Sequence, residues 1–463
     1  MKLLLLLSLC SIHTSALTLD EYMDMVVKKN RLISSYQISV EASQEKRVAG
    51  DLLLSPTLTA GYSELSDKSE PSSVADRRNT TSSNLGISKK FSTGTLLSLT
   101  ALTTKLAYDT PVTPGNMGYS TGGVGLLVQQ SLWKDFFGVA IRMRRERETL
   151  TSQLEMLGYE LQKRITLIQA ETDFWDYMVA QEDLKLKQAN FERAKKLDKW
   201  TANRVSNGIS DQTDLFQVRA LANLRELELA TSTQAVKTRE AKIKENLDFA
   251  VTENVPELTA DMAQTRPYVL NLAKSKNIVK IDTYLTSLEA TVKQKVSEEV
   301  VDSLRPDLTF LGKYNSSSYN VDHATMQSNL TNTNRPVTFV GLSLSWLFGS
   351  DAKSAQLSAA KKDALASRLK ADQAKISGEN AWFELLRQYD LTKQNVLTLE
   401  KIAQLQRDRA RAEQAKFTKG RTITSNVVNA ETDAAQAEVN YLSAKSGLRK
   451  LEASTQLFMA VAE

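Results

Sequence analysis

The side chains that most often carry catalysis are scarce in this chain. Its 463 residues include two histidines and one cysteine. His13 and Cys10 lie near the start, and His323 stands alone in a segment rich in Asn and Ser, where a histidine is more often solvated than catalytic. The sequence contains no glycine-rich phosphate loop and no paired metal-ligand spacing. We therefore expect no enzymatic activity, no cofactor and no metal site.

Two short segments around a glycine resemble each other more than the rest of the chain does. In Arg204-Val-Ser-Asn-Gly208 and Lys416-Phe-Thr-Lys-Gly420, a basic residue precedes a glycine by four positions, and polar residues and an Ala-rich stretch follow. Glycine enters left-handed conformations without a side-chain clash, so it suits a tight turn between two helices. Taken by themselves, these residues could simply end helices.

Helical periodicity leads into both turns. From about residue 137 to Val205 there is no Pro, and after Gly138 the single Gly is Gly158. Apolar or small side chains recur here every three or four positions, and the same spacing runs from Trp382 to Ala403, which indicates a coiled coil or a packed helix array. A helix of roughly 68 residues is about 100 Å long. We expect each long helix to be covered by shorter ones, near 18–50, 210–250, 268–302 and 423–460.

Other segments alternate with the period of a β-strand. They lie near residues 56–63, 123–130, 306–314 and 340–348. Alternation over about ten residues, with aromatic residues near the segment ends, is the pattern of a transmembrane β-strand, although a half-buried sheet of a soluble domain alternates in the same way. In the membrane interpretation three aromatic residues belong to an interfacial girdle: Trp133, Tyr314 and Trp346.

The order of these elements occurs twice, which predicts a tandem duplication. Residues 17–250 and 251–463 each contain a helix, strands, a long helix, a glycine turn and another helix. The strands are expected at about 54–132 and 304–348. The first half is longer because of an insertion around 71–118, which forms either a loop or two added strands. The alternation of Leu97, Leu99 and Ala101 favours added strands.

The N-terminus and the charge pattern bear on where the protein works. Lys2, an apolar run to Cys10 and the small residues before Leu17 predict a secretory signal over residues 1–16, although Cys10 could instead carry a lipid. No later stretch has the ~20 consecutive apolar residues of a membrane-spanning helix. The net charge of +5 is small, and the basic run 142–147 is interrupted by Glu, so we expect no nucleic-acid partner.

Together, the mature start Leu17-Thr-Leu-Asp-Glu-Tyr22, the two repeats and the two glycine turns resemble the TolC-like outer membrane efflux protein family over essentially the whole mature chain. The resemblance implies a mainly α fold with membrane β-strands. Three copies would close one β-barrel in the outer membrane and continue it as a long periplasmic α-helical barrel. The β-barrel would have about 12 strands if the insertion is an extracellular loop, or about 18 if it adds two strands to each copy. It also implies a periplasmic membrane-fusion adaptor, an inner-membrane transporter that supplies energy, and outer-membrane lipid as partners.

The resemblance assigns roles to residues around both turns. The turns would form the periplasmic tip on which the adaptor docks, and the docking residues are Arg204, Val205, Gly208, Lys416, Phe417 and Gly420. The residues that follow would surround a periplasmic aperture: Asp211, Asp214, Arg421, Asn426 and Asn429. Asn426 and Asn429 are amides where members of the family with an acidic tip have aspartates, so a strongly cation-selective aperture is in doubt. Arg421 would hydrogen-bond across the closed tip.

The function that follows is an outer-membrane channel subunit of a tripartite efflux or type I secretion system, a passive exit duct through periplasm and outer membrane. The alternative is an exported periplasmic coiled-coil scaffold, which explains the helical seams but neither the duplicated strands nor the glycine turns. The sequence does not identify the exported substrate.

Overall fold

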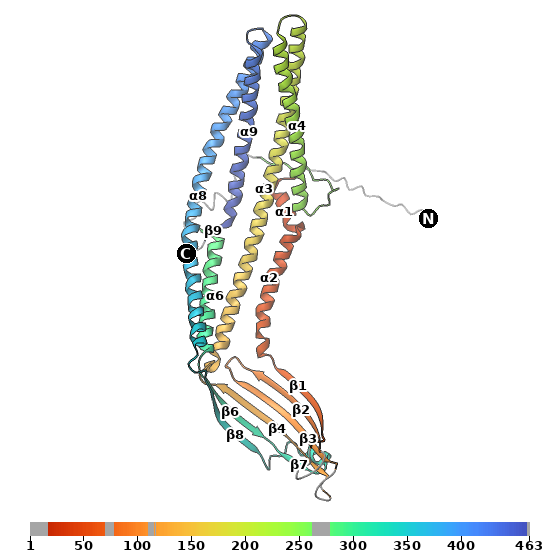
Figure 1. Ribbon diagram of the computed structural model, residues 1–463, viewed down its shortest axis with the longest axis vertical. Coiled ribbons are helices and arrows are strands. Elements are labelled where there is room, and N and C mark those ends of the chain that lie inside the picture. Colours follow the sequence, from red (N-terminus) through yellow and green to blue (C-terminus); the bar gives the residue numbers. More distant parts are fainter. Residues whose placement is uncertain (1–16, 70–77, 110–114, 116, 262–277, 461–463) are drawn as a thin grey trace, which may run out of the picture. The chain divides into compact units, whose positions relative to one another are not determined.

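A computed structural model describes residues 17–69, 78–109, 115, 117–261 and 278–460 of the chain (Figure 1). The chain forms two compact units, each assembled from separated stretches. The helical unit comprises Met1–Val40, Leu157–Leu285 and Gln373–Glu463, and the sheet unit comprises Glu41–Met156 and Thr286–Asp372. Among the described residues, no helix is both long enough and apolar enough to span a bilayer.

Two helices of equal length dominate the chain. Helices α3 (Val139–Ser206) and α8 (Asp351–Thr418) each have 68 residues, and each contributes to both units. The shorter helices are α1 (Leu19–Lys29), α2 (Arg31–Ala49), α4 (Gln212–Asn246), α6 (Ile281–Ser303) and α9 (Thr424–Ser454). In both halves of the chain, strands lie between a shorter helix and a 68-residue helix, and a further helix follows the long one, whereas the number and the kind of the elements between them differ.

The helix expected over 18–50 is divided at Asn30. Thr18 and Glu21 begin α1 with a reciprocal capping box, and α1 ends at Lys29. The Asn30 side-chain oxygen then accepts hydrogen bonds from the backbone N–H groups of Leu32 (3.0 Å) and Ile33 (3.2 Å). Asn30 therefore caps α2 and interrupts a helix whose apolar periodicity continues through it.

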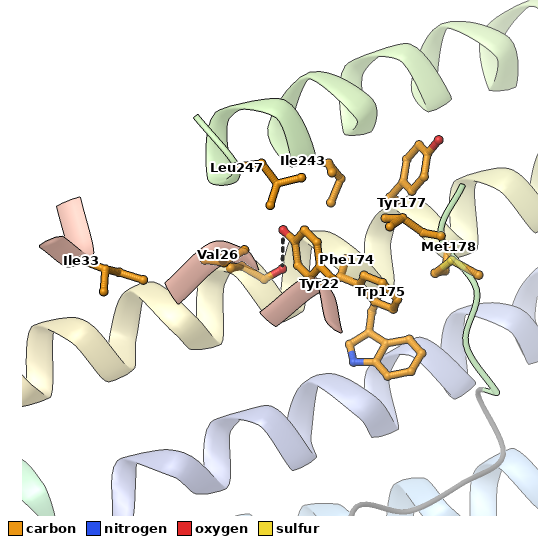
Figure 2. Packing of buried hydrophobic residues seen from close by; sticks show 11 residues of the cluster. Tyr22, Val26, Ile33, Phe174, Trp175, Tyr177, Met178, Ile243 and Leu247 are labelled. Carbon is orange, nitrogen blue, oxygen red and sulfur yellow. Dashed lines mark hydrogen bonds between the residues drawn. The ribbon is translucent and has the colours of Figure 1, made fainter. Parts of the chain in front are cut away.

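The helical unit is packed around aromatic side chains of α1 and α3 (Figure 2). The Tyr22 ring lies 5.2 Å from that of Phe174, which meets Trp175 edge-on at 5.3 Å. The Tyr22 hydroxyl donates to the backbone oxygen of Ala170 at 3.5 Å, so the one polar atom of this buried ring is satisfied. Ile243 of α4, Leu247 at its C-cap and Ile33 of α2 belong to the same cluster, which therefore joins four helices.

The sheet unit contains one antiparallel sheet whose main path has the order β1-β2-β3-β4-β6-β8 (Figure 1). The strands are β1 (Thr57–Asp67), β2 (Arg78–Lys90), β3 (Leu96–Tyr108), β4 (Gly118–Ser131), β6 (Asp307–Asn315) and β8 (Val337–Ser345). The insertion around 71–118 thus supplies β2 and β3, two added strands rather than a loop. A short strand β7 (Ser318–Asn320) also pairs with β4.

Three local features differ from expectation. Helix α6 begins at Ile281, and residues 278–280 are strand β5; residues 268–277 of the expected helix lie outside the described residues. Strand β5 pairs with β9 (Phe458–Ala460), at the end of the segment expected to be helical to 460. The connection between β6 and β8 contains helix α7 (His323–Ser328). His323 therefore starts a helix rather than lying in an irregular loop, and its Nδ1 is 3.1 Å from Ser120 Oγ.

Candidate functional site

The two faces of the sheet differ in chemistry. In a strand, alternate side chains point to opposite faces, so the register identifies the residues that share a face. Leu58 pairs with Ile87, Ile87 with Leu99, Leu99 with Leu126, and Leu126 with Tyr314. One face therefore carries an uninterrupted row of large apolar side chains across five strands.

This apolar face is exposed to its surroundings. The exposed fraction is 70% for Leu58 and 47% for Leu99, and on β8 it reaches 74% for Val340. Further exposed side chains of the same face are Tyr62, Leu85, Ile87, Leu97, Leu126, Tyr314, Leu342 and Leu344. A contiguous apolar patch of this size on a folded protein indicates a membrane or a protein partner.

The opposite face is polar, and glycines set its shape. Thr59 pairs with Gly86, Gly86 with Thr100, Thr100 with Gly125, and Gly125 with Asn315. A Cβ on Gly86 would lie 2.9 Å from Thr59 Oγ1, and one on Gly125 would lie 2.3 Å from Asn315 Oδ1. The glycines thus leave room for the polar side chains of their neighbours, and side chains of this face line a hollow of about 240 Å³.

Lys313 is the charged residue that lines this hollow. Other cations on the polar face have carboxylate partners, with Arg78 3.1 Å from Asp67 and Lys90 3.4 Å from Asp135. Lys313 Nζ instead has a neutral partner, the side-chain oxygen of Asn315 at 3.3 Å when that amide faces it. The middle of this face therefore presents hydroxyl groups, glycine backbone and one ammonium group, next to the exposed apolar side chains of Leu102, Val337 and Phe339.

The aromatic residues predicted to form a girdle are all exposed. Trp133 is 50% exposed and Trp346 is 48% exposed, and the Trp346 ring lies 4.3 Å from that of Phe348. Tyr314 belongs to the apolar face opposite Leu126. The sequence interpretation missed the exposed pair Phe136 and Phe137, whose signal was two adjacent aromatic residues directly after a strand.

In the helical unit, both glycine turns have the same backbone geometry. Gly208 has φ +72° and Gly420 has φ +70°. Ile209 N–H donates to the Arg204 oxygen at 2.8 Å and Gly208 N–H to the Val205 oxygen at 3.0 Å. In the second turn, Arg421 donates to Lys416 at 2.9 Å and Gly420 to Phe417 at 3.0 Å, again between backbone atoms. This pair of bonds ends a helix at a left-handed glycine, which explains the spacing found in the sequence.

The two turns lie at the same end of the helical unit and are joined by an aromatic cluster (Figure 1). The Trp200 ring of α3 is 4.5 Å from the Phe417 ring of α8. The Arg204 guanidinium lies 4.7 Å from the Trp200 ring and donates to Ser210 Oγ at 3.2 Å. Trp200 was not among the predicted site residues, although its position one helical turn before Arg204 places both on one helix face.

The predicted docking residues differ in exposure, and Arg204 and Val205 are half-buried. Phe417 is only 2% exposed, so its ring packs inside this cluster and is not free to meet a partner. Gly208, Gly420 and Lys416 are exposed, and Lys416 Nζ pairs with Glu413 at 2.7 Å. The largest exposed apolar side chains of the turns are two that the prediction omitted, Ile209 and Ile423.

The predicted aperture residues follow the turns at the starts of α4 and α9. Asp211 is the N-cap residue of α4, its side chain makes no capping bond, and Asp214 lies in the first helical turn. Arg421 is exposed, and Asn426 Nδ2 donates to Thr422 Oγ1 at 3.2 Å. The first turn is thus followed by carboxylates, whereas the second carries cations and is followed by the exposed amides Asn426 and Asn429.

A second hollow, of about 360 Å³, is lined by α3, α8 and α9 in the helical unit. Burial raises the pKa of Glu438 in its wall, against the opposing effect of Arg193 and Arg407. Arg407 Nε is 3.5 Å from Glu438 Oε1, whereas Glu438 Oε2 is buried without a hydrogen-bond partner. Burial also raises the pKa of Tyr441 to about 12, and its hydroxyl donates to Glu400 at 2.8 Å.

The fold of the chain, with a two-faced antiparallel sheet and paired helical hairpins, is shared by solved structures. No protein-family model and no curated protein matches the sequence. The fold is similar to that of the outer membrane protein VceC from Vibrio cholerae, with TM-score 0.69, 12% identity, and 95% of each chain covered. It is also similar to that of CusC, whose structures are described as showing transmembrane channel formation. The TM-score is 0.68 at 11% identity, and the match covers 95% of this chain and 91% of that chain.

The MtrE outer membrane channel of Neisseria gonorrhoeae, solved in its open state, gives a TM-score of 0.66 at 14% identity, covering 94% of this chain and 87% of that one. These likenesses establish that the chain has the fold of outer-membrane channels. The TolC-like resemblance is therefore confirmed at the level of the fold of the single chain, mainly α with a β-sheet.

Proposed function

We propose that this protein is the subunit of an outer-membrane channel that forms a passive exit duct through periplasm and outer membrane. The observation that carries the proposal is the two-faced sheet, with the apolar row from Leu58 to Tyr314 on one side and the hydroxyl and glycine row from Thr59 to Asn315 on the other. In a membrane wall, the apolar face contacts lipid and the polar face contacts water.

The wall requires further copies of the chain. The outer strands of the sheet, β1 and β8, do not pair with each other, and unpaired strand edges are not tolerated in lipid. The path has an even number of alternating strands, so β8 of one copy and β1 of the next are antiparallel, and a ring of copies closes without breaking the pattern. The proposed ring is a homotrimer.

The helices also present surface to a neighbouring copy. On α8 the exposed side chains Leu369, Ile376 and Phe383 recur every seven residues. Phe216 and Leu227 are exposed on α4. A heptad stripe left open in one chain is suited to pack against a helix of another copy, which supports a continuous helical wall.

The turns are proposed to form the periplasmic end of the duct, where an adaptor docks. Docking is proposed through the exposed backbone around Gly208 and Gly420, while Phe417 and Arg204 hold the two turns together. The duct has no energy source of its own, so an inner-membrane transporter would drive export in an efflux or type I secretion system. The proposed location is the outer membrane with a large periplasmic part.

Single-channel conductance of the detergent-purified protein in a planar lipid bilayer tests this function. The proposal expects discrete steps whose size changes with Asn426→Asp and Asn429→Asp, because added carboxylates alter ion flow at an aperture. The matched control is Asn440→Asp, which makes the same change at an exposed position of α9 away from the turns. A protein that stays soluble without detergent and forms no channel would instead support a periplasmic coiled-coil scaffold.

A further inference from the structure

We infer that the added hairpin β2–β3 is an integral part of the membrane wall, so that three copies close an 18-stranded barrel wide enough for large hydrophilic cargo. This inference rests on the proposed function and specifies the substrate class of the same duct. It follows from the place of the hairpin in the sheet, from its two faces and from the way its turn is held.

The hairpin occupies the middle of the sheet rather than its rim. Strand β1 pairs with β2 over its whole length, β3 pairs with β4, and the sheet order places no direct pairing between β1 and β4. Removing the hairpin from the wall would therefore detach β1 as well. Each added strand has 13 residues, more than the 9–11 that a tilted strand needs to cross a bilayer.

Both faces of the sheet continue through the hairpin without interruption. Its Ile87 and Leu99 lie in the apolar row, and its Gly86 and Thr100 lie in the polar row. A hairpin lying in water above the membrane would have no reason to keep a large exposed apolar side on the same face as its neighbours. The alternation therefore indicates the same two environments for β2 and β3 as for β1 and β4.

The turn of the hairpin is fixed to the start of α3. A Cβ on Gly138 would lie 2.0 Å from the Ser92 backbone oxygen, so the two backbones are in close contact there. Thr95 Oγ1 also donates to Gln130 Oε1 at 2.5 Å. A tight, anchored turn at this end of the strands is typical of the periplasmic side of a membrane barrel.

The strand number sets the width of the duct. Six strands from each of three copies give 18 strands. Barrel diameter grows roughly linearly with strand number, so this wall is about 1.5 times as wide as one of 12 strands. Barrels of 16–18 strands enclose an aqueous channel, and the row of hydroxyl and glycine residues from Thr59 to Asn315 gives hydrophilic solutes a polar path along this face, next to Leu102 and Val337.

Cysteine accessibility tests the placement of the hairpin. Single cysteines at Thr100 and Leu99 probe the two faces of β3, and cysteines at Thr59 and Leu58 serve as the matched pair on β1. Each variant is reconstituted in lipid vesicles and treated with a membrane-impermeant maleimide, and wild type gives the background labelling. We expect Thr100→Cys to label at least about tenfold faster than Leu99→Cys, and Thr59→Cys faster than Leu58→Cys by a similar factor.

The two pairs separate the possible failures. Equal labelling at positions 99 and 100, with alternation kept at 58 and 59, would overturn the inference and leave the duct intact. Loss of alternation in both pairs would overturn the membrane wall itself. Because a substitution can disturb folding, electron microscopy of the wild-type assembly gives an independent count: 18 strands support the inference, and 12 contradict it.

Discussion

The guanidinium carbon of Arg204 lies 5.5 Å from the centre of the Phe417 ring, so the first glycine turn is joined to the second by a cation–π contact. Trp200 packs against the same ring, and Val218 of α4 and Val427 of α9 lie in the same buried cluster. Residues of α3, α4, α8 and α9, the four helices that flank the turns, therefore belong to one buried cluster with Phe417. Movement of either hairpin at this end has to disturb that packing.

Phe417→Ala should loosen the contact between the two hairpins. Truncating a buried phenylalanine lowers the free energy of unfolding by about 3–5 kcal/mol. Here the lost packing is that between the two turns. We expect faster proteolysis at the turns and a higher resting conductance. The matched control is Phe216→Ala, because Phe216 is 59% exposed on α4. Equal effects of the two substitutions would show that the cluster does not hold the turns together.

Replacing a turn glycine with alanine should have the opposite effect on stability from replacing a glycine inside a helix. Gly208 and Gly420 have positive φ, so Gly208→Ala and Gly420→Ala should each destabilise the protein by about 1–2 kcal/mol. Gly158 lies inside α3 with open space around its Cβ position, so Gly158→Ala should stabilise by about 0.5–1 kcal/mol. Thermal unfolding in detergent measures all three, and a stabilising Gly208→Ala would contradict the turn geometry.

The sequence predicted the features that depend on local signals. The long helices could be recognised because a Pro-free periodic run extends to Val205, and the turns because a glycine follows a basic residue at the spacing that the terminal hydrogen bonds require. The break at Asn30 was missed because the apolar pattern continues through it, and the competing cap is made by one side chain. Local periodicity does not reveal such a cap.

Contacts between distant segments of the chain could not be predicted from the sequence. The alternation of Leu97, Leu99 and Ala101 indicated a strand but not its neighbours, so loop and wall remained alternatives for the insertion. Phe417 was assigned to docking because the family resemblance places both turns at the docking tip, whereas the tertiary partner Trp200 buries it. Burial of a residue next to a turn is decided by which helix packs against it, and one chain's pattern does not specify that.

The charge on Glu438 should cost stability at neutral pH. Burial raises the pKa of Glu438 in the folded state above that in the unfolded chain. The stability that protonated Glu438 contributes to the folded protein is therefore fully present below the unfolded pKa and is lost as pH rises through the folded pKa. Glu438→Gln should therefore raise the melting temperature at pH 7, and the gain should shrink as pH falls towards the ordinary glutamate pKa of 4.5. Glu384→Gln is the control, because hydrogen bonds from Gln388 and Arg387 lower the pKa of the exposed Glu384 and its loss should cost a little stability at pH 7.

Arg421→Ala should raise the resting conductance of the assembled channel. Arg421 is exposed, and its guanidinium is available to bond across a closed tip in the trimer. Lys419→Ala removes a neighbouring exposed cation and controls for a general change in charge. An unchanged conductance in Arg421→Ala, or an equal rise in both variants, would contradict a specific hydrogen bond of Arg421 across the closed tip.

Lys313→Glu should shift the ion preference of the duct towards cations. Lys313 lines the hollow of the polar face and has a neutral amide as its partner, so in a trimer it contributes a ring of ammonium groups to the water-filled side. The matched control is Lys105→Glu, because Lys105 shares its face with Leu99 and Ala101.

Reversal potentials across a salt gradient measure the shift. Dilute salt is needed, because the Debye length is about 30 Å at 0.01 M but only about 10 Å at 0.1 M. We expect a change for Lys313→Glu that weakens as salt is added, and little change for Lys105→Glu. A larger effect at Lys105 than at Lys313 would mean that the apolar and polar faces have been assigned to the wrong sides of the wall.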